Sequence, residues 1–230
     1  MSSELKVYRL AVCLYPGLTV LDYQGPIEIL GGFSTEVLAS FGHLYKTRPP
    51  CSINVEFLSH TMEPVKPFTG PAVVPTMTYK EALEADIDII LIPGGPNSDP
   101  KLLDPSLIEF LKKRGPLAKH ILTICTGSWV LAGTGLLDGK RATSNKASFK
   151  LVVEATKDLN ITWIPKARWV VNDDKHIWTS SGVTAGMDLA NAFLEYFVGE
   201  KFAEEIRGIV ELKATKDPND DEFATYHGLV

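Results

Sequence analysis

The stretch HILTICTGSWVLAGTGLLDG, residues 120–139, decides how the rest of the chain is interpreted. The apolar, β-branched run 121–124 is typical of a buried strand, and Thr126-Gly127-Ser128 leads directly into an apolar segment, 129–132, that is predicted to be helical. Cys125 lies at the junction, where small following residues let the sharp turn of a nucleophile elbow close. Because a helix N-terminus favours an anion, we expect a stabilised thiolate and a reactive cysteine.

The alternative for any cysteine in an apolar strand is a buried structural residue. The strand, turn and helix around Cys125 favour the nucleophile, whereas Cys13 is expected to lie in the core. Cys13, Cys51 and Cys125 form no CxxC or metal-ligand spacing, and their odd number argues against a disulfide framework. The scattered histidines and carboxylates offer no zinc-site spacing either, so the sequence predicts no metal.

Composition and charge narrow the class of protein. The 230 residues are 45% hydrophobic and 22% charged, with a net charge of −5 and no basic stripe that would suit a nucleic acid. The start, MSSELKVYRLAVCLYPG, resembles neither a signal peptide nor a membrane anchor. We therefore expect a cytoplasmic protein that binds neither nucleic acid nor membrane.

Strand and helix patterns alternate along the whole chain. Apolar runs at 5–15, 52–59, 87–92 and 121–124 suit a mostly parallel sheet, and three shorter strands are predicted at 161–164, 169–172 and 176–179. Helices are predicted from about residue 27, after a turn at Gly25-Pro26, and at 105–115, 129–132, 146–159, 185–197 and 203–212. This order predicts one α/β domain over 1–212, a three-layer sandwich. The polar, acidic tail 213–230 is expected to be an extended or partly disordered arm.

Three segments that follow strands carry candidate chemistry. Asp22 is expected in the loop after the first strand, and Gly94-Gly95 follow the strand 87–92. Because the carboxyl ends of parallel strands share one edge of a sheet, both should meet Cys125 there. We predict Cys125 as the nucleophile, Asp22 as its acid/base partner, and the N–H groups of Gly95 and Thr126 as an anion-stabilising pair; a tight turn without a ligand is the alternative for the glycines.

Whether Asp22 raises or lowers the pKa of the Cys125 thiol depends on whether its carboxyl is ionised or protonated. An ionised Asp22 would raise the thiol pKa, whereas a protonated one could donate a hydrogen bond to a thiolate, so the two should behave as a coupled pair sharing one proton. Glu28 is a competing carboxylate, with an exposed, a capping or a supporting role open to it. No histidine lies in a motif, which disfavours a Cys–His hydrolase. The chain also lacks GxGxxG after a strand and GxxxxGK[ST].

Four segments together are similar to the ThiJ/PfpI superfamily, and most closely to its isonitrile hydratase (cyclohexyl-isocyanide hydratase) branch. They are YPGLTVLDYQGPIEIL, LIPGG, ICTGSWVLAGTGLLDGKRATSN and TSSGVTAGMDLA. The resemblance spans about residues 5–212. It implies a flavodoxin-like sandwich, a homodimer, a small-molecule substrate, and no metal or organic cofactor. It also implies Asp22, Cys125 and Thr126 as catalytic residues. Gly94 and Gly95 are expected near the substrate from their place at the carboxyl end of a strand.

One position departs from the family pattern. After LLDGKRAT the family commonly carries a histidine, and this chain has Ser144-Asn145-Lys146. Asn145 can orient a group but cannot take a proton, which weakens activities that need a Cys–His pair. The resemblance implies hydration of isonitriles to N-substituted formamides. Glyoxalase- or deglycase-like chemistry and a non-enzymatic cysteine redox sensor stay open as alternatives.

Overall fold

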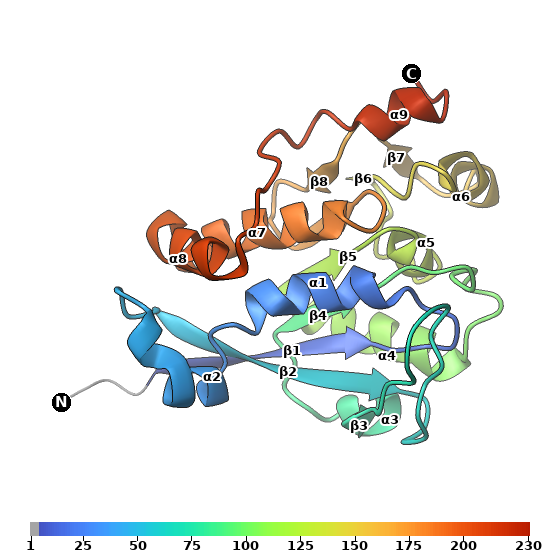
Figure 1. Cartoon of the computed structure of the whole chain (residues 1–230). Coiled ribbons are helices and arrows are strands. Elements are labelled where there is room, and N and C mark those ends of the chain that lie inside the picture. The colour runs from blue at the N-terminus through green and yellow to red at the C-terminus, as the bar shows by residue number, and fades with distance from the viewer. Residues whose placement is uncertain (1–4) are drawn as a thin grey trace.

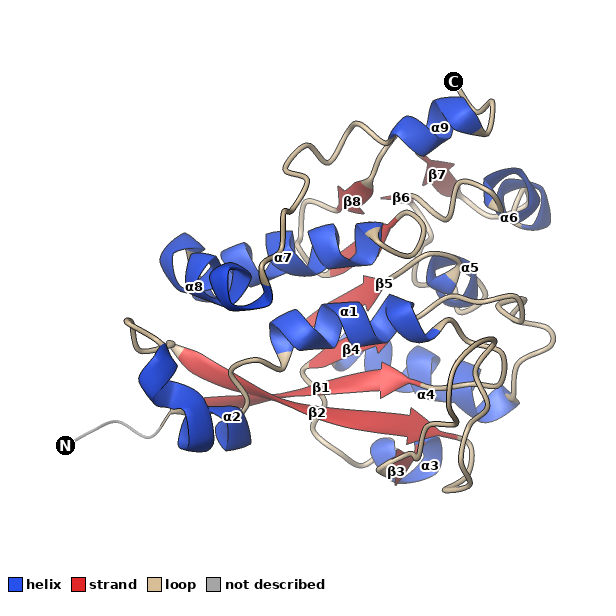
Figure 2. Ribbon diagram, viewed as in Figure 1, coloured by secondary structure: helices blue, strands red, loops and turns tan. Residues whose placement is uncertain are grey.

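A seven-stranded sheet forms the centre of the computed structural model, which describes residues 5–230 (Figures 1 and 2). Its strands are β1 (Lys6–Cys13), β2 (Cys51–Ser59), β3 (Met77–Thr78), β4 (Ile89–Ile92), β5 (His120–Thr123), β8 (Trp169–Val171) and β9 (Ile177–Ser180). They lie in the order β3-β2-β1-β4-β5-β9-β8, and every neighbouring pair is parallel except β8 with β9. The predicted mostly parallel α/β sheet is confirmed, and its strand order is that of flavodoxin-like folds.

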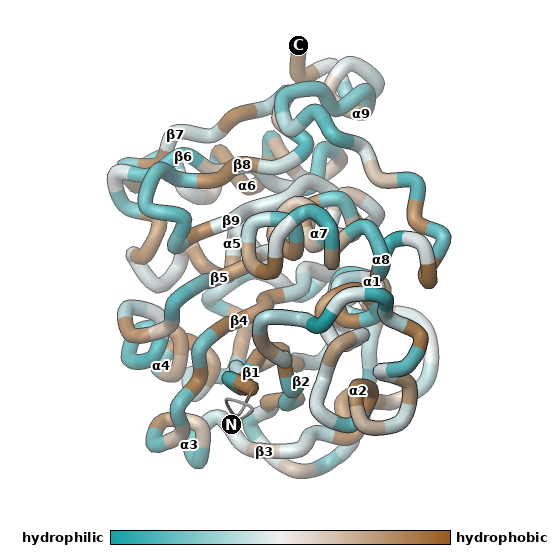
Figure 3. Tube along the Cα trace, turned by 90° about the vertical axis from the view of Figure 1, so that its left-hand side faces the viewer, coloured by the Kyte–Doolittle hydropathy of each residue, from teal (hydrophilic) through white to brown (hydrophobic). Residues whose placement is uncertain are grey.

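Helices cover both faces of this sheet. The α-helices of the chain are α1 (Val20–Leu30), α2 (Thr35–Phe41), α3 (Tyr79–Ala82), α4 (Pro105–Arg114), α5 (Gly127–Ala132), α6 (Phe149–Ala155), α7 (Ala185–Val198), α8 (Glu200–Val210) and α9 (Glu222–Tyr226). Of these, α6 and α9 lie away from the sheet (Figure 1). Figure 3 shows α3 and α4 on one side of the strands and α1, α2 and α8 on the other. Within residues 5–230, no helix has the length and apolar character needed to cross a membrane.

The core follows from strands that are buried on both faces. All four residues of β4, IILI, are buried, as is the second half of β1. Continuous apolar runs of this kind are typical of parallel strands covered by helices on both sides. A separate two-stranded parallel sheet, β6 (Lys140–Ala142) with β7 (Ile161–Trp163), lies beside the main one.

Helix α1 begins earlier than predicted. It starts at Val20 rather than near residue 27, so Asp22 lies in its first turn and not in a loop, and Pro26 lies inside the helix. The expected turn at Gly25-Pro26 is therefore wrong. The helix packs closely on α7, where a Cβ on Gly25 would come within 2.8 Å of Met187 Cγ.

The elbow between β5 and α5 is packed directly on β4. A Cβ on Gly127 would lie 2.1 Å from the Ile92 carbonyl oxygen, which is backbone and cannot move aside. Only glycine therefore allows α5 to begin this close to the neighbouring strand. The predicted strand, turn and helix at this point agree with the structure, with the strand ending at Thr123 and the helix beginning at Gly127.

The C-terminal tail is attached to the domain by a buried charge cluster. Arg168 donates to Asp188 Oδ2 at 2.6 Å and lies 3.7 Å from Asp221 Oδ1. Asp188 Oδ1 also accepts from the Thr215 N–H at 2.7 Å. The tail runs as an extended segment and then forms helix α9, whose first turn is capped by Asp221. The sequence pattern does not predict this contact, because Arg168 and Asp221 are distant from each other in the sequence.

The close approach at the elbow predicts opposite effects for two glycine substitutions. Gly127→Ala should lower the free energy of unfolding by about 1–3 kcal/mol, because the added methyl overlaps the β4 backbone. Gly208→Ala, in α8 with no atom within 4 Å of the new methyl, should raise it by about 0.5–1 kcal/mol. Urea denaturation measures both values. A Gly127→Ala protein as stable as the wild type would contradict the packing argument.

The charge cluster predicts that Asp188 is important for stability. Asp188→Ala leaves the largely buried Arg168 without its main partner and should cost about 3 kcal/mol in thermal or urea denaturation. Glu154→Ala, which removes an exposed pair with Lys157, is the matched control and should cost less than about 1 kcal/mol. Equal effects of the two substitutions would show that Arg168 does not depend on Asp188.

Candidate active site

The elbow places Cys125 in a backbone conformation that non-glycine residues seldom adopt. Its φ is +58°, and its N–H donates to the Ser181 carbonyl at 3.0 Å. The side chain is 5% exposed. A strained, fixed nucleophile position of this kind is common at active sites, because the surrounding structure holds it in place.

Asp22 lies against this thiol from the first turn of α1. Its side chain is fully buried, and its Oδ2 accepts a hydrogen bond from the Gly94 N–H at 2.8 Å. The carboxyl also interacts with the Cys125 thiol. Its other oxygen, Oδ1, has no partner of regular hydrogen-bond geometry in the described part of the chain. One carboxylate oxygen is thus fixed, and the other is left with unused acceptor capacity beside the cysteine.

Thr126 is held by the same glycine loop. Its Oγ1 accepts from the Gly95 N–H at 3.0 Å and lies 2.7 Å from Ser98 Oγ. The Gly94 and Gly95 amides therefore both have partners within the protein in this structure and hold Asp22 and Thr126. The anion-stabilising role of Gly95 and the substrate contact of Gly94 stay predictions.

The hydrogen bonds to the sulfur come from other groups. The backbone N–H groups of Thr126 and Val183 and the side chain of Asn145 interact with the Cys125 thiol. The anion-stabilising role predicted for the Thr126 N–H stays a prediction. Val183 was not predicted; its φ of +30° marks a tight turn before α7 that only the structure reveals. Asn145, which stands where the family commonly has histidine, reaches the nucleophile and also accepts from the Ser148 N–H at 3.2 Å.

Two predicted or considered residues lie outside the site. Glu28 is exposed and accepts from Gln24 Nε2 at 2.9 Å, so of its alternatives the exposed helical role is the observed one. His120 lies at the opposite end of β5, where its Nδ1 is 2.8 Å from the Lys175 carbonyl oxygen. In residues 5–230 no cluster of His, Cys, Asp or Glu is arranged to hold a metal ion.

Burial shifts both titrating groups in the site toward their neutral forms. It raises the pKa of Asp22 to about 7, despite the Gly94 and Cys125 hydrogen bonds that act to lower it. Burial, together with the nearby Asp22 charge, raises the pKa of Cys125 to about 12. The expected stabilised thiolate is therefore wrong, because desolvation outweighs the amides at the start of the short helix α5. At neutral pH the thiol keeps its proton, and Asp22 is the group poised to receive it.

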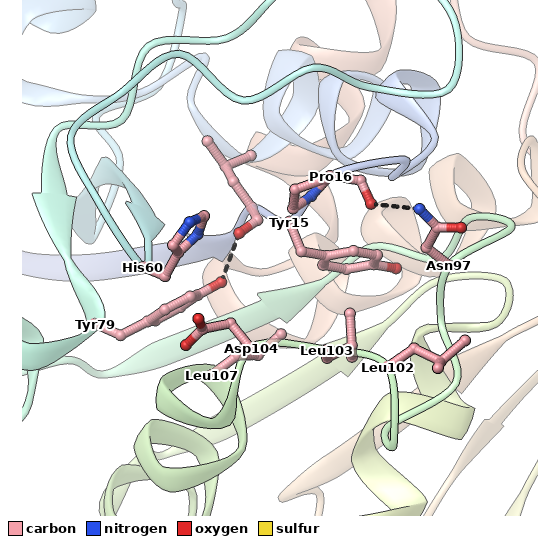
Figure 4. Close-up of a pocket in the computed structure, with 10 residues that line it drawn as sticks. Tyr15, Pro16, His60, Tyr79, Asn97, Leu102, Leu103, Asp104 and Leu107 are labelled. Atoms are coloured by element: carbon pink, nitrogen blue, oxygen red, sulfur yellow. Dashed lines mark hydrogen bonds between the residues drawn. The ribbon is translucent and has the colours of Figure 1, made fainter.

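A cavity of about 500 Å³ lies next to this site, at the carboxyl ends of β1 and β4 (Figure 4). Tyr15 forms part of its wall, together with Leu14, Pro16, His60, Tyr79, Asn97, Leu102, Leu103, Asp104 and Leu107. Neither Cys125 nor Asp22 lines it. Tyr15 joins the cavity wall to the active site, because its hydroxyl lies 3.1 Å from Ser98 Oγ, next to Thr126.

Comparison with known proteins finds relatives that cover most of the chain. The chain is 28% identical to the isonitrile hydratase of Pseudomonas putida over 199 residues, which is 86% of this chain and 76% of the relative. A ThiJ/PfpI family protein from Pseudomonas syringae has a similar structure, with a TM-score of 0.74, 25% identity, and coverage of 92% of this chain and 78% of the other.

Similarity of fold extends to more distant proteins. Drosophila melanogaster DJ-1beta superimposes with a TM-score of 0.68 at 18% identity, over 90% of this chain and 98% of that one. The model of the DJ-1/PfpI family matches residues 10–196, which include the second half of β1, α1, the glycine loop, the elbow and most of α7. On this match the chain belongs to the DJ-1/PfpI family.

Proposed function

We propose that this protein hydrates isonitriles to N-substituted formamides, with Cys125 as nucleophile and Asp22 as acid and base. The observation that carries the proposal is the buried Cys125–Asp22 pair, whose carboxyl titrates near neutrality beside a protonated thiol. The similarity to an isonitrile hydratase over most of the chain supports the same reaction. No metal or organic cofactor enters this scheme.

The first half of the reaction moves one proton from sulfur to carbon. The sulfur of Cys125 bonds to the terminal carbon of R–N≡C while the thiol proton passes to the Asp22 carboxylate. Asp22 then gives this proton to the same carbon, which yields the thioimidate R–N=CH–S–Cys. The Thr126 and Val183 N–H groups and the Asn145 side chain stabilise negative charge that develops on the sulfur.

The second half adds water and releases the product. Asp22, ionised again, takes a proton from water as the water oxygen bonds to the thioimidate carbon, and the nitrogen receives that proton. The carbon–sulfur bond then breaks, the hydroxyl proton returns to the sulfur through Asp22, and R–NH–CHO leaves. Thr126 takes part by fixing the Gly94–Gly95 loop that holds Asp22, rather than by contacting Asp22 with its hydroxyl.

The alternatives receive less support from the site. Glyoxalase- and deglycase-like chemistry through a Cys–His pair lacks its base, because Asn145 contacts the thiol and cannot take a proton. A peroxide sensor needs an exposed thiolate, whereas burial raises the pKa of this thiol to about 12. The homodimer and the cytoplasmic location that the sequence predicts are part of the proposal, as is the division into a domain, 1–212, and an arm, 213–230.

The nucleophile is tested by turnover of a simple alkyl isonitrile. Cys125→Ala should lower formamide production more than about 1000-fold, because no other group can form the thioimidate. Cys51→Ala, a buried cysteine at the start of β2, is the matched control and should retain wild-type turnover. Full activity of Cys125→Ala would refute the mechanism, and absence of turnover in the wild type would refute the hydratase function.

The raised Asp22 pKa predicts how stability depends on pH. In the folded protein the carboxyl prefers its neutral form, so its ionisation as pH rises from about 4 through 7 favours the unfolded chain. Between pH 5 and 8 the wild type should therefore lose on the order of 2 kcal/mol relative to Asp22→Asn, which has no charge to gain.

Urea denaturation of both proteins at the two pH values measures this difference. The Asp22→Asn variant should also turn over isonitriles at least about 100-fold more slowly, because it cannot carry the proton. Parallel pH profiles of stability would show that Asp22 titrates normally. Retained activity of the variant would assign the acid/base role to another group.

A further inference from the structure

Two buried hydroxyl groups behind Thr126 are not used by the reaction scheme. Ser98 is fully buried and follows the glycine loop, and Tyr15, 2% exposed, comes directly after β1. The Tyr15 hydroxyl donates to the Pro93 carbonyl at 2.8 Å, and Ser98 Oγ donates to the Gly95 carbonyl at 2.6 Å. The two side chains thus bind the carbonyl groups on either side of Gly94.

The N–H groups of the same loop donate hydrogen bonds to the active-site residues. Gly94 donates to Asp22 Oδ2 and Gly95 donates to Thr126 Oγ1. A Cβ on Gly94 would lie 2.5 Å from the Thr126 nitrogen, so the loop can approach the elbow only without a side chain. Gly94 and Gly95 have no side chains that could fix the loop. Its orientation therefore depends on the hydrogen bonds of its peptide groups, which include those from the Thr19 N–H to the Gly94 carbonyl at 2.8 Å and from the Ser98 N–H to the Gly95 carbonyl at 3.2 Å.

One arrangement of the hydroxyl protons satisfies every group in this cluster; in another, Thr126 Oγ1 donates to the Gly95 carbonyl at 3.2 Å and accepts from Ser98. In the first, Ser98 gives its proton to the Gly95 carbonyl, and its oxygen is free to accept from Thr126 Oγ1, 2.7 Å away. Thr126 in turn accepts from the Gly95 N–H. A closed ring of hydrogen bonds then joins Ser98, Thr126 and the Gly95 peptide groups, and Tyr15 supports it at 3.1 Å from Ser98.

We propose that Ser98, supported by Tyr15, is a positioning residue that holds the Pro93–Gly95 loop so that the Gly94 N–H keeps Asp22 against Cys125. Neither side chain contacts Cys125 or Asp22 by a hydrogen bond, so both act through the loop. Substitution of Ser98 should loosen the Gly94–Asp22 hydrogen bond and leave the nucleophile in place.

The expected consequence is a change in the titration of Asp22. Burial raises its pKa, and the Gly94 N–H and the Cys125 thiol oppose that increase. The ionisable groups near this carboxyl are Cys125 from the elbow and Tyr15 from the end of β1. Both stay neutral near pH 7, since burial raises each of their pKa values. A weaker Gly94 bond should therefore raise the Asp22 pKa further.

The test is an NMR titration of protein labelled with ¹³C at the aspartate carboxyl groups, with the Asp22 signal assigned by its loss in Asp22→Asn. Ser98→Ala should move the midpoint of Asp22 upward from about 7 by about 0.5–1 pH unit. Tyr15→Phe should move it in the same direction by less, and provides the test if Ser98→Ala does not fold. Ser52→Ala removes another fully buried serine hydroxyl, on β2, which has no hydrogen-bond partner within residues 5–230, and should leave the midpoint unchanged.

Folded Ser98→Ala and Tyr15→Phe proteins with the wild-type midpoint would overturn the proposal, because both hydroxyl groups would then only fill space. A kinetic measurement adds a second readout, and it alone rests on the proposed function. With an alkyl isonitrile, Ser98→Ala should lower kcat about 10-fold or more with KM unchanged within about 2-fold. A raised KM with unchanged kcat would make Ser98 a substrate contact and overturn the positioning role.

If the wild type does not turn over isonitriles, the hydratase proposal fails and the NMR titration still decides the role of Ser98. If the wild type turns over isonitriles and the Asp22 midpoint is unchanged in Ser98→Ala and Tyr15→Phe, the positioning proposal fails and the proposed function is retained. The two proposals can therefore be rejected separately.

Discussion

The hydrogen bond from the Gly94 N–H to Asp22 is the interaction on which the site depends. It joins the loop after β4 to the first turn of α1, the helix that follows β1. The next amide, Gly95, joins the same loop to Thr126 in the elbow after β5. Because β1, β4 and β5 are parallel neighbours, their carboxyl ends bring these three segments to one edge of the sheet.

Burial determines the chemistry of the pair that these contacts assemble. The apolar sheet and its helices exclude water from Asp22 and Cys125, and both pKa values rise. A thiolate at neutral pH is thereby disfavoured, which differs from cysteine enzymes that rely on a preformed ion pair. The cysteine instead needs a nearby base of near-neutral pKa, and Asp22 has that property because it is buried without a cation beside it. The same burial costs stability at alkaline pH, as expected for a functional carboxyl.

The C-terminal arm, residues 213–230, contacts the helix that follows one side of the active site. Arg168 joins Asp188, in the first turns of α7, to Asp221 in the arm. Helix α7 follows the turn that contains Val183, whose N–H contacts the Cys125 sulfur. One side of the active site therefore belongs to a segment whose position depends in part on the tail.

The sequence by itself determined the sheet, the elbow and the meeting of Asp22 with Cys125. Continuous apolar runs such as IILI, and small residues after Cys125, report burial and turn geometry locally, so no long-range information is needed. Only the tertiary structure decided where α1 begins, that Gly94 and Gly95 donate inward, that Val183 and Asn145 reach the thiol, and that the thiol stays protonated. Each of these depends on the direction of an N–H group or on the exclusion of water by segments distant in the sequence. The hydrophobic pattern of one segment predicts neither of them.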